Sequence, residues 1–189
     1  MAGVKTNFGD LTPLLSPKSI AIVGASENPA KVGGRVIINL QKSRYKGKLN
    51  LVNPNYSEIS GIPCYKKLTD IPDEIDVVII TVPVPLVLPT LDECEQKKVK
   101  FVMIFSGGFA EMGEEGRELQ NKIKQFANRT GIRIYGPNVP GLFNMKERIG
   151  MSLSPRFEPD LFVTGKAALI TQGGGMGRAI LDSNDSGLG

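Results

Sequence analysis

The 189-residue sequence contains no histidine and no tryptophan, and it has only two cysteines. Without an imidazole, these residues cannot form a Ser–His triad, a histidine-ligated zinc site or a phosphohistidine. Cys64 and Cys94 lie far apart and not at the spacing of metal ligands. We therefore expect reduced thiols and a cytoplasmic location.

Long apolar runs are also absent. The longest, over residues 77–88, is interrupted by Pro83 and Pro85 and is too short to span a bilayer. The start of the sequence lacks the apolar core of a signal peptide. The net charge is +4, but the lysines are scattered and aromatic residues rarely lie between them. This pattern argues against a nucleic-acid or membrane partner and remains compatible with a small polyanionic ligand.

The most informative stretch is residues 19–42, SIAIVGASENPAKVGGRVIINLQK. It predicts a buried strand over 19–23, a loop that begins at Gly24, and a helix from about Gly33. The free N–H groups and dipole of such a helix start favour an anion, most often phosphate. Two interpretations remain open: a phosphate site with a non-standard loop, or a βαβ unit whose glycines only permit close packing.

The loop is not the dinucleotide fingerprint, because Ser26 and Pro29 stand where that motif needs glycines. NAD-binding folds also place an acid at the end of the second strand, where it holds the ribose hydroxyls. Here that strand ends in Asn53 and Pro54. An amide would not repel a phosphate on the ribose, as a carboxylate would, but Asn-Pro is equally a common turn.

The remaining chain alternates between predicted strands and helices. Strands are expected over 48–52, 76–82, 100–105 and 132–135, helices over 85–97 and 114–130, and a loop with a short helix over 57–70. This order predicts an α/β fold, a Rossmann-like doubly wound parallel sheet with right-handed crossovers. Five loops follow strands and should gather at the carboxyl edge, where such sheets bind ligands: 24–34, 53–56, 82–85, 105–109 and 136–141.

The pattern changes after residue 145. Residues 146–165 contain Pro155 and Pro159 and are predicted to be a linker. A strand over 166–171, a glycine-rich turn over 172–175 and a helix over 176–184 would then begin a second αβ unit. One strand and one helix cannot form a sheet alone, so this unit either packs on the first domain or belongs to a longer protein.

Six segments, in order, resemble the N-terminal part of the NDP-forming acyl-CoA synthetases, relatives of the succinyl-CoA synthetase α subunit. They are IAIVGASENPAKVGG, LVNPNY, DVVIITVPVP, FSGGFAEMGEEG, GIRIYGPNVPGLFN and KAALITQGGGMGRAILD. The resemblance implies a CoA-binding Rossmann-like domain over 1–145 and the first strand and helix of an incomplete flavodoxin-like domain over 166–189. The sequence departs from the family pattern at Tyr56, Val139 and Gly173, where a lysine, a cysteine and a serine are usual.

The resemblance also implies a coenzyme A site. The CoA phosphates would be held by Gly24, Ala25, Ser26, Lys31, Val32 and Gly33, and the adenosine would border Asn53 and Pro54. The pantetheine path would be lined by Val82, Pro83, Phe105, Ser106 and Gly107, and the floor near the thiol by 136–141, including Asn138. A phosphoryl group would meet Gln172, Gly173 and Gly174. No catalytic residue and no metal ligand are expected among these residues.

The implied function is that of the CoA-binding portion of an acid–thiol ligase. The complete enzyme would convert acyl-CoA, NDP and phosphate to acid, CoA and NTP through a phosphohistidine. That histidine, an ATP-grasp domain or subunit, the nucleotide (ATP/ADP or GTP/GDP) and magnesium would all lie outside these 189 residues. The chain alone should therefore not catalyse the full reaction. Two alternatives remain, a stand-alone CoA or nucleotide-binding module and an NAD(P)-linked oxidoreductase, and a homo-oligomer is left open.

Overall fold

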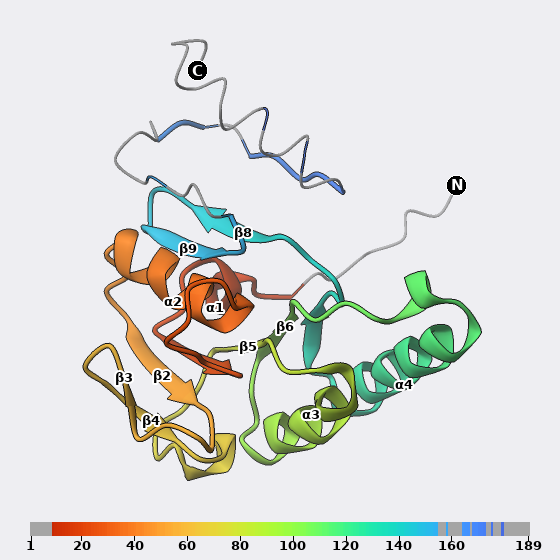
Figure 1. Cartoon of the computed structure of the whole chain (residues 1–189). Helices are drawn as coiled ribbons and strands as arrows, with labels where there is room; N and C mark the ends of the chain where they lie inside the picture. The colour runs from red at the N-terminus through yellow and green to blue at the C-terminus, as the bar shows by residue number, and fades with distance from the viewer. Residues whose placement is uncertain are drawn as a thin grey trace.

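The computed structural model describes residues 9–154, 158, 164–166, 168–172, 175 and 179. Its centre is a seven-stranded sheet in the order β3-β4-β2-β1-β5-β6-β7 (Figure 1). The strands are β1 (Ser19–Val23), β2 (Lys48–Val52), β3 (Glu58–Ile59), β4 (Ile62–Tyr65), β5 (Val77–Ile80), β6 (Phe101–Ile104) and β7 (Arg133–Tyr135). Neighbouring strands run parallel except β3 and β4. The predicted doubly wound α/β fold is thus confirmed.

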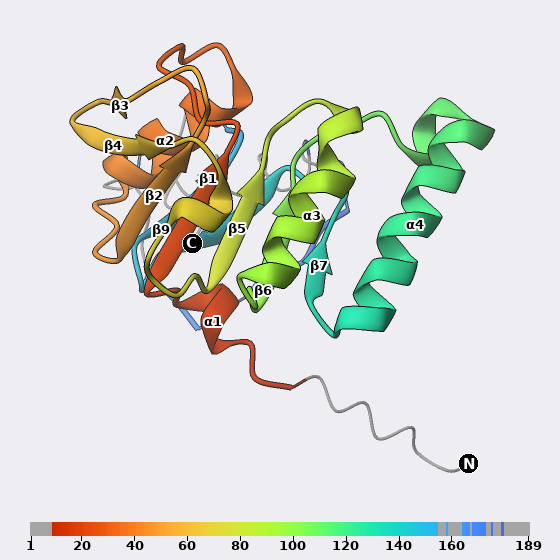
Figure 2. The same ribbon diagram turned by 90° about the horizontal axis from the view of Figure 1, so that it is seen from below.

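Helices cover both faces of this sheet. They are α1 (Thr12–Leu15), α2 (Val32–Lys42), α3 (Val87–Gln96) and α4 (Glu114–Thr130), with 3-10 turns η1 (Leu68–Asp70), η2 (Val84–Leu86) and η3 (Ala110–Met112). Figure 2 shows α3 and α4 side by side on one face. No helix in the described part of the chain is both long and apolar enough to cross a membrane.

The apolar core divides into two layers because side chains alternate along each strand. Ile20 and Ile22 of β1 belong to the layer that includes the apolar side of α2. Ala21 and Val23 belong to the layer under α3 and α4. All five residues of β1 are buried, as expected for a central parallel strand covered on both faces.

A hairpin of β8 (Gly141–Asn144) and β9 (Ile149–Ser152) covers part of the α2 face (Figure 1). The predicted linker over 146–165 is therefore wrong at 149–152, where all four residues are buried. Ile149 and Met151 pack into the α2 layer, and the Asn39 side-chain amide donates to the carbonyl oxygens of Ser152 at 2.8 Å and Ser154 at 2.9 Å. Alternating apolar residues make this segment a strand once a neighbouring strand pairs with it.

A second hairpin, β3–β4, stands where the sequence predicts a loop with a short helix. Ser60 and Gly61 both have positive φ, at 52° and 78°, as a two-residue hairpin turn requires. β4 then pairs in parallel with β2 and extends the sheet by one strand. The predicted short helix survives as η1 alone.

The strand predicted over 166–171 does not form among its described residues, 166 and 168–171. Leu169 and Ile170 are 51% and 99% exposed, so neither contributes to the core. A strand needs a hydrogen-bonded neighbour, and no strand pairs with these residues in the described part of the chain. The second αβ unit remains a prediction, as does the boundary at residue 145.

Candidate functional site

The carboxyl edge of the sheet contains a topological switch point. From β1 the chain moves to β2 and β4 on one side, and it then crosses back to β5 on the other side of β1 (Figure 2). The loop after β1 leads to α2 and the loop after β5 leads to α3, on opposite faces of the sheet. Open α/β sheets bind their ligands at such points.

The loop after β1 is tied to both neighbouring strands. Gly24 has a φ of 92°, and its N–H donates to the Val52 carbonyl oxygen at 3.0 Å, as the N–H of Ala25 does at 3.3 Å. The Thr81 hydroxyl lies 2.9 Å from the Val23 carbonyl oxygen and 3.1 Å from that of Gly24. The amides of Gly24 and Ala25 therefore position the loop and are already bonded to protein.

The middle of this loop holds its own shape through side-chain hydrogen bonds. The buried Ser26 hydroxyl accepts from the N–H of Asn28 at 3.1 Å, and the Asn28 side-chain oxygen accepts from the N–H of Ala30 at 2.9 Å. Lys31 follows as the extended N-cap residue of α2 and is exposed. The loop therefore leads into the helix with a cation at its start.

The first turn of α2 supplies donors that no described residue accepts from. In the described part of the chain, the N–H groups of Val32, Gly33 and Gly34 have no hydrogen-bond acceptor. Together with the helix dipole they favour an anion. Both glycines also allow the helix to approach the loop, because a Cβ at Gly33 would lie 2.1 Å from the Gly24 carbonyl oxygen and one at Gly34 2.2 Å from that of Asn28. Phosphate binding and close packing, which the sequence left as alternatives, are thus compatible here.

Asn53 connects the loops after β1 and β2. Its side-chain amide donates to the Ala25 carbonyl oxygen at 2.7 Å, and its side-chain oxygen accepts from the N–H of Asn55 at 3.0 Å. The Cys64 thiol donates to the Asn53 carbonyl oxygen at 3.6 Å, and burial raises the pKa of that thiol. Both ends of the Asn53 side chain are thus bonded to protein, while the following residue, Pro54, is exposed.

Hydrogen bonds join the loops after β5, β6 and β7. The Ser106 hydroxyl donates to the Val82 carbonyl oxygen at 2.6 Å, and the N–H of Asn138 donates to the Ser106 carbonyl oxygen at 3.1 Å. Pro83 and Gly107 are exposed beside these residues. The structure therefore brings together four residues predicted to line the pantetheine path, with Asn138 from the predicted floor.

Phe105, also predicted to line the pantetheine path, is only 4% exposed and packs in the α2 layer, and its role there stays a prediction. Two residues at this edge were missed by the sequence analysis. One is Thr81, described above. The other is Glu111, whose carboxylate accepts from the N–H of Gly108 at 2.7 Å, a hydrogen bond that lowers the pKa of that carboxyl. A polar residue directly after an apolar strand is the only sequence signal that marks Thr81.

The third predicted group lies largely beyond the described structure. Gln172 is exposed in a bend, and Gly173 and Gly174 are outside the described residues. A phosphoryl site there stays a prediction. Within the described residues, no group of three or more histidine, cysteine, aspartate or glutamate side chains is placed to hold a metal ion.

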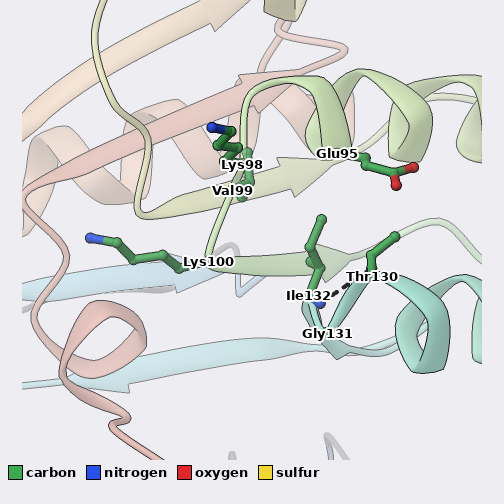
Figure 3. Close-up of a pocket in the computed structure, with 7 residues that line it drawn as sticks. All are labelled: Glu95, Lys98, Val99, Lys100, Thr130, Gly131 and Ile132. Carbon is green, nitrogen blue, oxygen red and sulfur yellow. Dashed lines mark hydrogen bonds between the residues drawn. The ribbon is translucent and has the colours of Figure 1, made fainter.

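A surface pocket at the opposite edge of the sheet is a separate feature (Figure 3). It lies where α3 and α4 end and β6 and β7 begin, and it is lined by Glu95, Lys98, Val99, Lys100, Thr130, Gly131 and Ile132. Two of its charged residues are paired, Glu95 with Arg129 and Lys100 with Asp76. The pocket thus lies at the edge of the sheet opposite the switch point and the predicted site residues that follow β1, β2, β5 and β6.

The strand order and the switch point define a protein of the Rossmann-like α/β class. Residues 18–145 match the family model described as CoA binding domain, and the chain belongs to that family. Among curated relatives, it is 38% identical over 183 residues to the ADP-forming acetate–CoA ligase II of Archaeoglobus fulgidus, covering 95% of this chain and 27% of the relative. It is 39% identical over 175 residues to the α subunit of the ADP-forming acetate–CoA ligase I of Pyrococcus furiosus, covering 90% and 37%.

Solved structures agree with this assignment. The dinucleotide-forming acetyl-coenzyme A synthetase 1 of Ca. Korarchaeum cryptofilum, in complex with phosphate and ADP, superposes with a TM-score of 0.84 at 36% identity, covering 92% of this chain and 36% of the other. A conserved hypothetical protein of Pyrococcus furiosus has a TM-score of 0.51 at 30% identity, covering 62% of this chain and 90% of that one. The chain thus spans between a quarter and two fifths of the ligases compared here.

Proposed function

We propose that this chain is the CoA-binding portion of an ADP-forming acyl-CoA synthetase. The observation that carries the proposal is the set of N–H groups at the start of α2 that find no acceptor among the described residues, at the switch point of a CoA-binding domain. Such a helix start binds phosphate. The curated relatives named above are ADP-forming acetate–CoA ligases, which supports this class of reaction.

The CoA diphosphate would lie at the first turn of α2, with Val32, Gly33 and Gly34 donating N–H groups and Lys31 supplying positive charge. Gly24 and Ala25 would act through their backbone N–H groups and Ser26 through its hydroxyl, by holding the loop in place. The adenosine would extend over the ends of β2 and β4, beside Asn53 and Pro54.

The pantetheine arm would run in the other direction along the sheet edge, between Val82–Pro83 and Ser106–Gly107. Its thiol would then approach the loop at 136–141, including Asn138. The role of this chain is to bind CoA and orient its thiol. The acyl group, the phosphoryl-carrying histidine and the nucleotide would come from an ATP-grasp domain or subunit and from further parts of the enzyme.

Isothermal titration with CoA tests this proposal. We expect a CoA-dependent heat and a rise in the melting temperature, and we expect NADH to produce neither. Ser26→Asp places a carboxylate at the loop and should weaken CoA binding by repulsion, whereas Ser26→Ala removes the hydroxyl without adding charge and should weaken it less. A protein that prefers NADH to CoA would instead be an oxidoreductase, and one that binds neither would refute the assignment.

A second candidate function is that of a stand-alone CoA-binding module. The short Pyrococcus furiosus protein favours it, because 90% of that chain superposes on part of this one. The two functions are separated by adding the matching ATP-grasp protein and the histidine-bearing part of the enzyme together with acetate, ATP and CoA. Formation of acetyl-CoA would support the ligase, and CoA binding without any turnover would support the module.

A further inference from the structure

The ends of β2 and β4 lie next to each other at the carboxyl edge. The two strands run parallel, with Val52 opposite Tyr65, and the N–H of Asn53 donates to the Tyr65 carbonyl oxygen at 2.9 Å. Lys66 is the next residue after Tyr65 and is exposed. The sequence analysis missed this neighbour because it predicted a loop in place of β4.

The charges at this corner favour an anion. β2 ends without an acid, in Asn53, whose side chain is bonded to protein at both ends. In the part of the chain that the structure describes, Lys66 has no ion-pair partner, whereas Lys42, Lys48 and Lys100 each pair with a carboxylate. Among the described residues, no carboxylate therefore neutralises the charge of Lys66.

The spacing between β1 and β4 along the carboxyl edge suits an adenosine that carries a ribose phosphate in addition to the diphosphate. β4 lies two strands from β1, roughly 10 Å away at about 4.8 Å per strand. A diphosphate at the start of α2 would place the adjoining ribose over the end of β2, between the two lysines at this edge. Lys31 would then be near the diphosphate, and Lys66 near any phosphate on the ribose.

We propose that Lys66 binds the 3′-phosphate of coenzyme A and makes this edge discriminate CoA from dephospho-CoA. This inference rests on the proposed function, because it needs the adenosine at the end of β2. Lys66 recognises the ligand by charge and adds nothing to the chemistry at the thiol. A carboxylate at position 53, as in NAD-binding folds, would oppose the same phosphate.

The neighbouring residue provides a matched control. Lys67 has the same charge and is also exposed, but its N–H donates to the Asp70 carboxylate at 3.0 Å, which places an acid beside it. Loss of the Lys67 charge should therefore matter less to an anion than loss of the Lys66 charge. Neither side chain contributes to the core, so neither substitution should unfold the protein.

The experiment measures the affinities of the wild type, Lys66→Ala and Lys67→Ala for CoA and for dephospho-CoA by calorimetry, at low and at physiological salt. For Lys66→Ala we expect CoA to bind about two- to fivefold more weakly, as the loss of one exposed ion pair implies, and dephospho-CoA to bind as before. The loss should shrink as salt screens the contact. Lys66→Arg should restore the preference for CoA.

The outcomes separate this inference from the proposed function. If the wild type binds CoA but Lys66→Ala changes the affinities for CoA and dephospho-CoA equally, or changes neither, then Lys66 does not recognise the 3′-phosphate. The proposed CoA site would be unaffected by that result. An equal effect of Lys67→Ala would also overturn the assignment to Lys66. If the wild type binds neither ligand, the proposed function itself fails.

Discussion

Substitution of Gly33 by alanine tests both the packing of α2 and its role in binding. A Cβ at this position would lie 2.1 Å from the Gly24 carbonyl oxygen and 3.1 Å from the Thr81 hydroxyl oxygen. Non-bonded carbon and oxygen atoms pack at about 3.5 Å, so the helix or the loop must move by more than about 1 Å. The obstructing atom belongs to the backbone and cannot rotate out of the way as a flexible side chain would.

Two opposing terms set the expected loss of stability. Alanine improves helix propensity over glycine by up to about 1 kcal/mol, while overpacking costs about 1–3 kcal/mol. We expect a net loss of about 1–2 kcal/mol in the free energy of unfolding. For a chain of this size, that lowers the melting temperature by roughly 2–8 °C.

Gly33→Ala should weaken CoA binding by more than its loss of folding stability alone would. A displacement of about 1 Å takes the first N–H groups of α2 out of hydrogen-bond range of a phosphate. One charge-assisted hydrogen bond contributes about 1.5–3 kcal/mol, so we expect at least about tenfold weaker binding of CoA by Gly33→Ala. Calorimetric titration with CoA, alongside thermal unfolding, measures the two effects separately.

Gly131→Ala is the matched control. Gly131 has a φ of 74° at the C-cap of α4, and a Cβ there would meet no other atom within 4 Å. The left-handed conformation costs alanine about 1–2 kcal/mol, at the edge of the sheet opposite the candidate site. The two variants should therefore lose similar stability, and only Gly33→Ala should lose affinity for CoA. Unchanged CoA binding by Gly33→Ala would refute the reasoning, as would an equal loss of affinity by Gly131→Ala.

Three further predictions concern stability and thiol reactivity. Burial alone would raise the pKa of Asp76, but hydrogen bonds from Lys100 and from main-chain N–H groups hold it below the ordinary value. The ionised Asp76 side chain therefore stabilises the fold above its unfolded pKa of about 3.9, and this contribution is lost as the pH falls through the lower folded pKa. Asp76→Ala should lower the free energy of unfolding by about 1–3 kcal/mol at pH 7 and by progressively less below about pH 4. Urea titrations at each pH measure this difference. Asn39→Ala removes the amide that joins α2 to the β9 segment and should cost about 1–3 kcal/mol by the same measurement, whereas an unchanged unfolding midpoint would show that the hairpin does not depend on it. Burial raises the pKa of the Cys94 thiol, so a thiol reagent should modify Cys64 first and Cys94 only on unfolding. Equal modification rates of the two thiols in the folded protein would contradict the burial of Cys94.

Local pattern alone predicted much of the sheet. The strands over 19–23 and 48–52 and the helix over 114–130 have the bounds that the sequence analysis expects. Each has a signal within its own residues: an apolar run that follows or precedes turn residues, or an apolar stripe at helical spacing. The loops that follow these strands could be assigned to one edge for the same reason, because parallel strands place their carboxyl ends together.

Two segments could not be predicted from their own residues. β4 is a strand because it pairs with β2, and β9 is a strand because it pairs with β8, which precedes it along the chain. Conversely, the apolar run over 166–171 resembles a strand but forms none among its described residues, where no partner strand is available. Whether such a short segment forms a strand depends on a pairing partner, and a short apolar run alone does not determine it.

The sequence by itself determined the class of fold, the glycine-bearing loop after β1 and the resemblance to CoA-binding proteins, because these depend on residue types at short spacing. Only the tertiary structure decided that β1 and β5 flank the switch point, that the amides of Gly24 and Ala25 are already bonded, and that Lys66 lies beside Asn53. These facts depend on the order of strands in the sheet, which is set by long-range pairing and burial and is not encoded in any single segment.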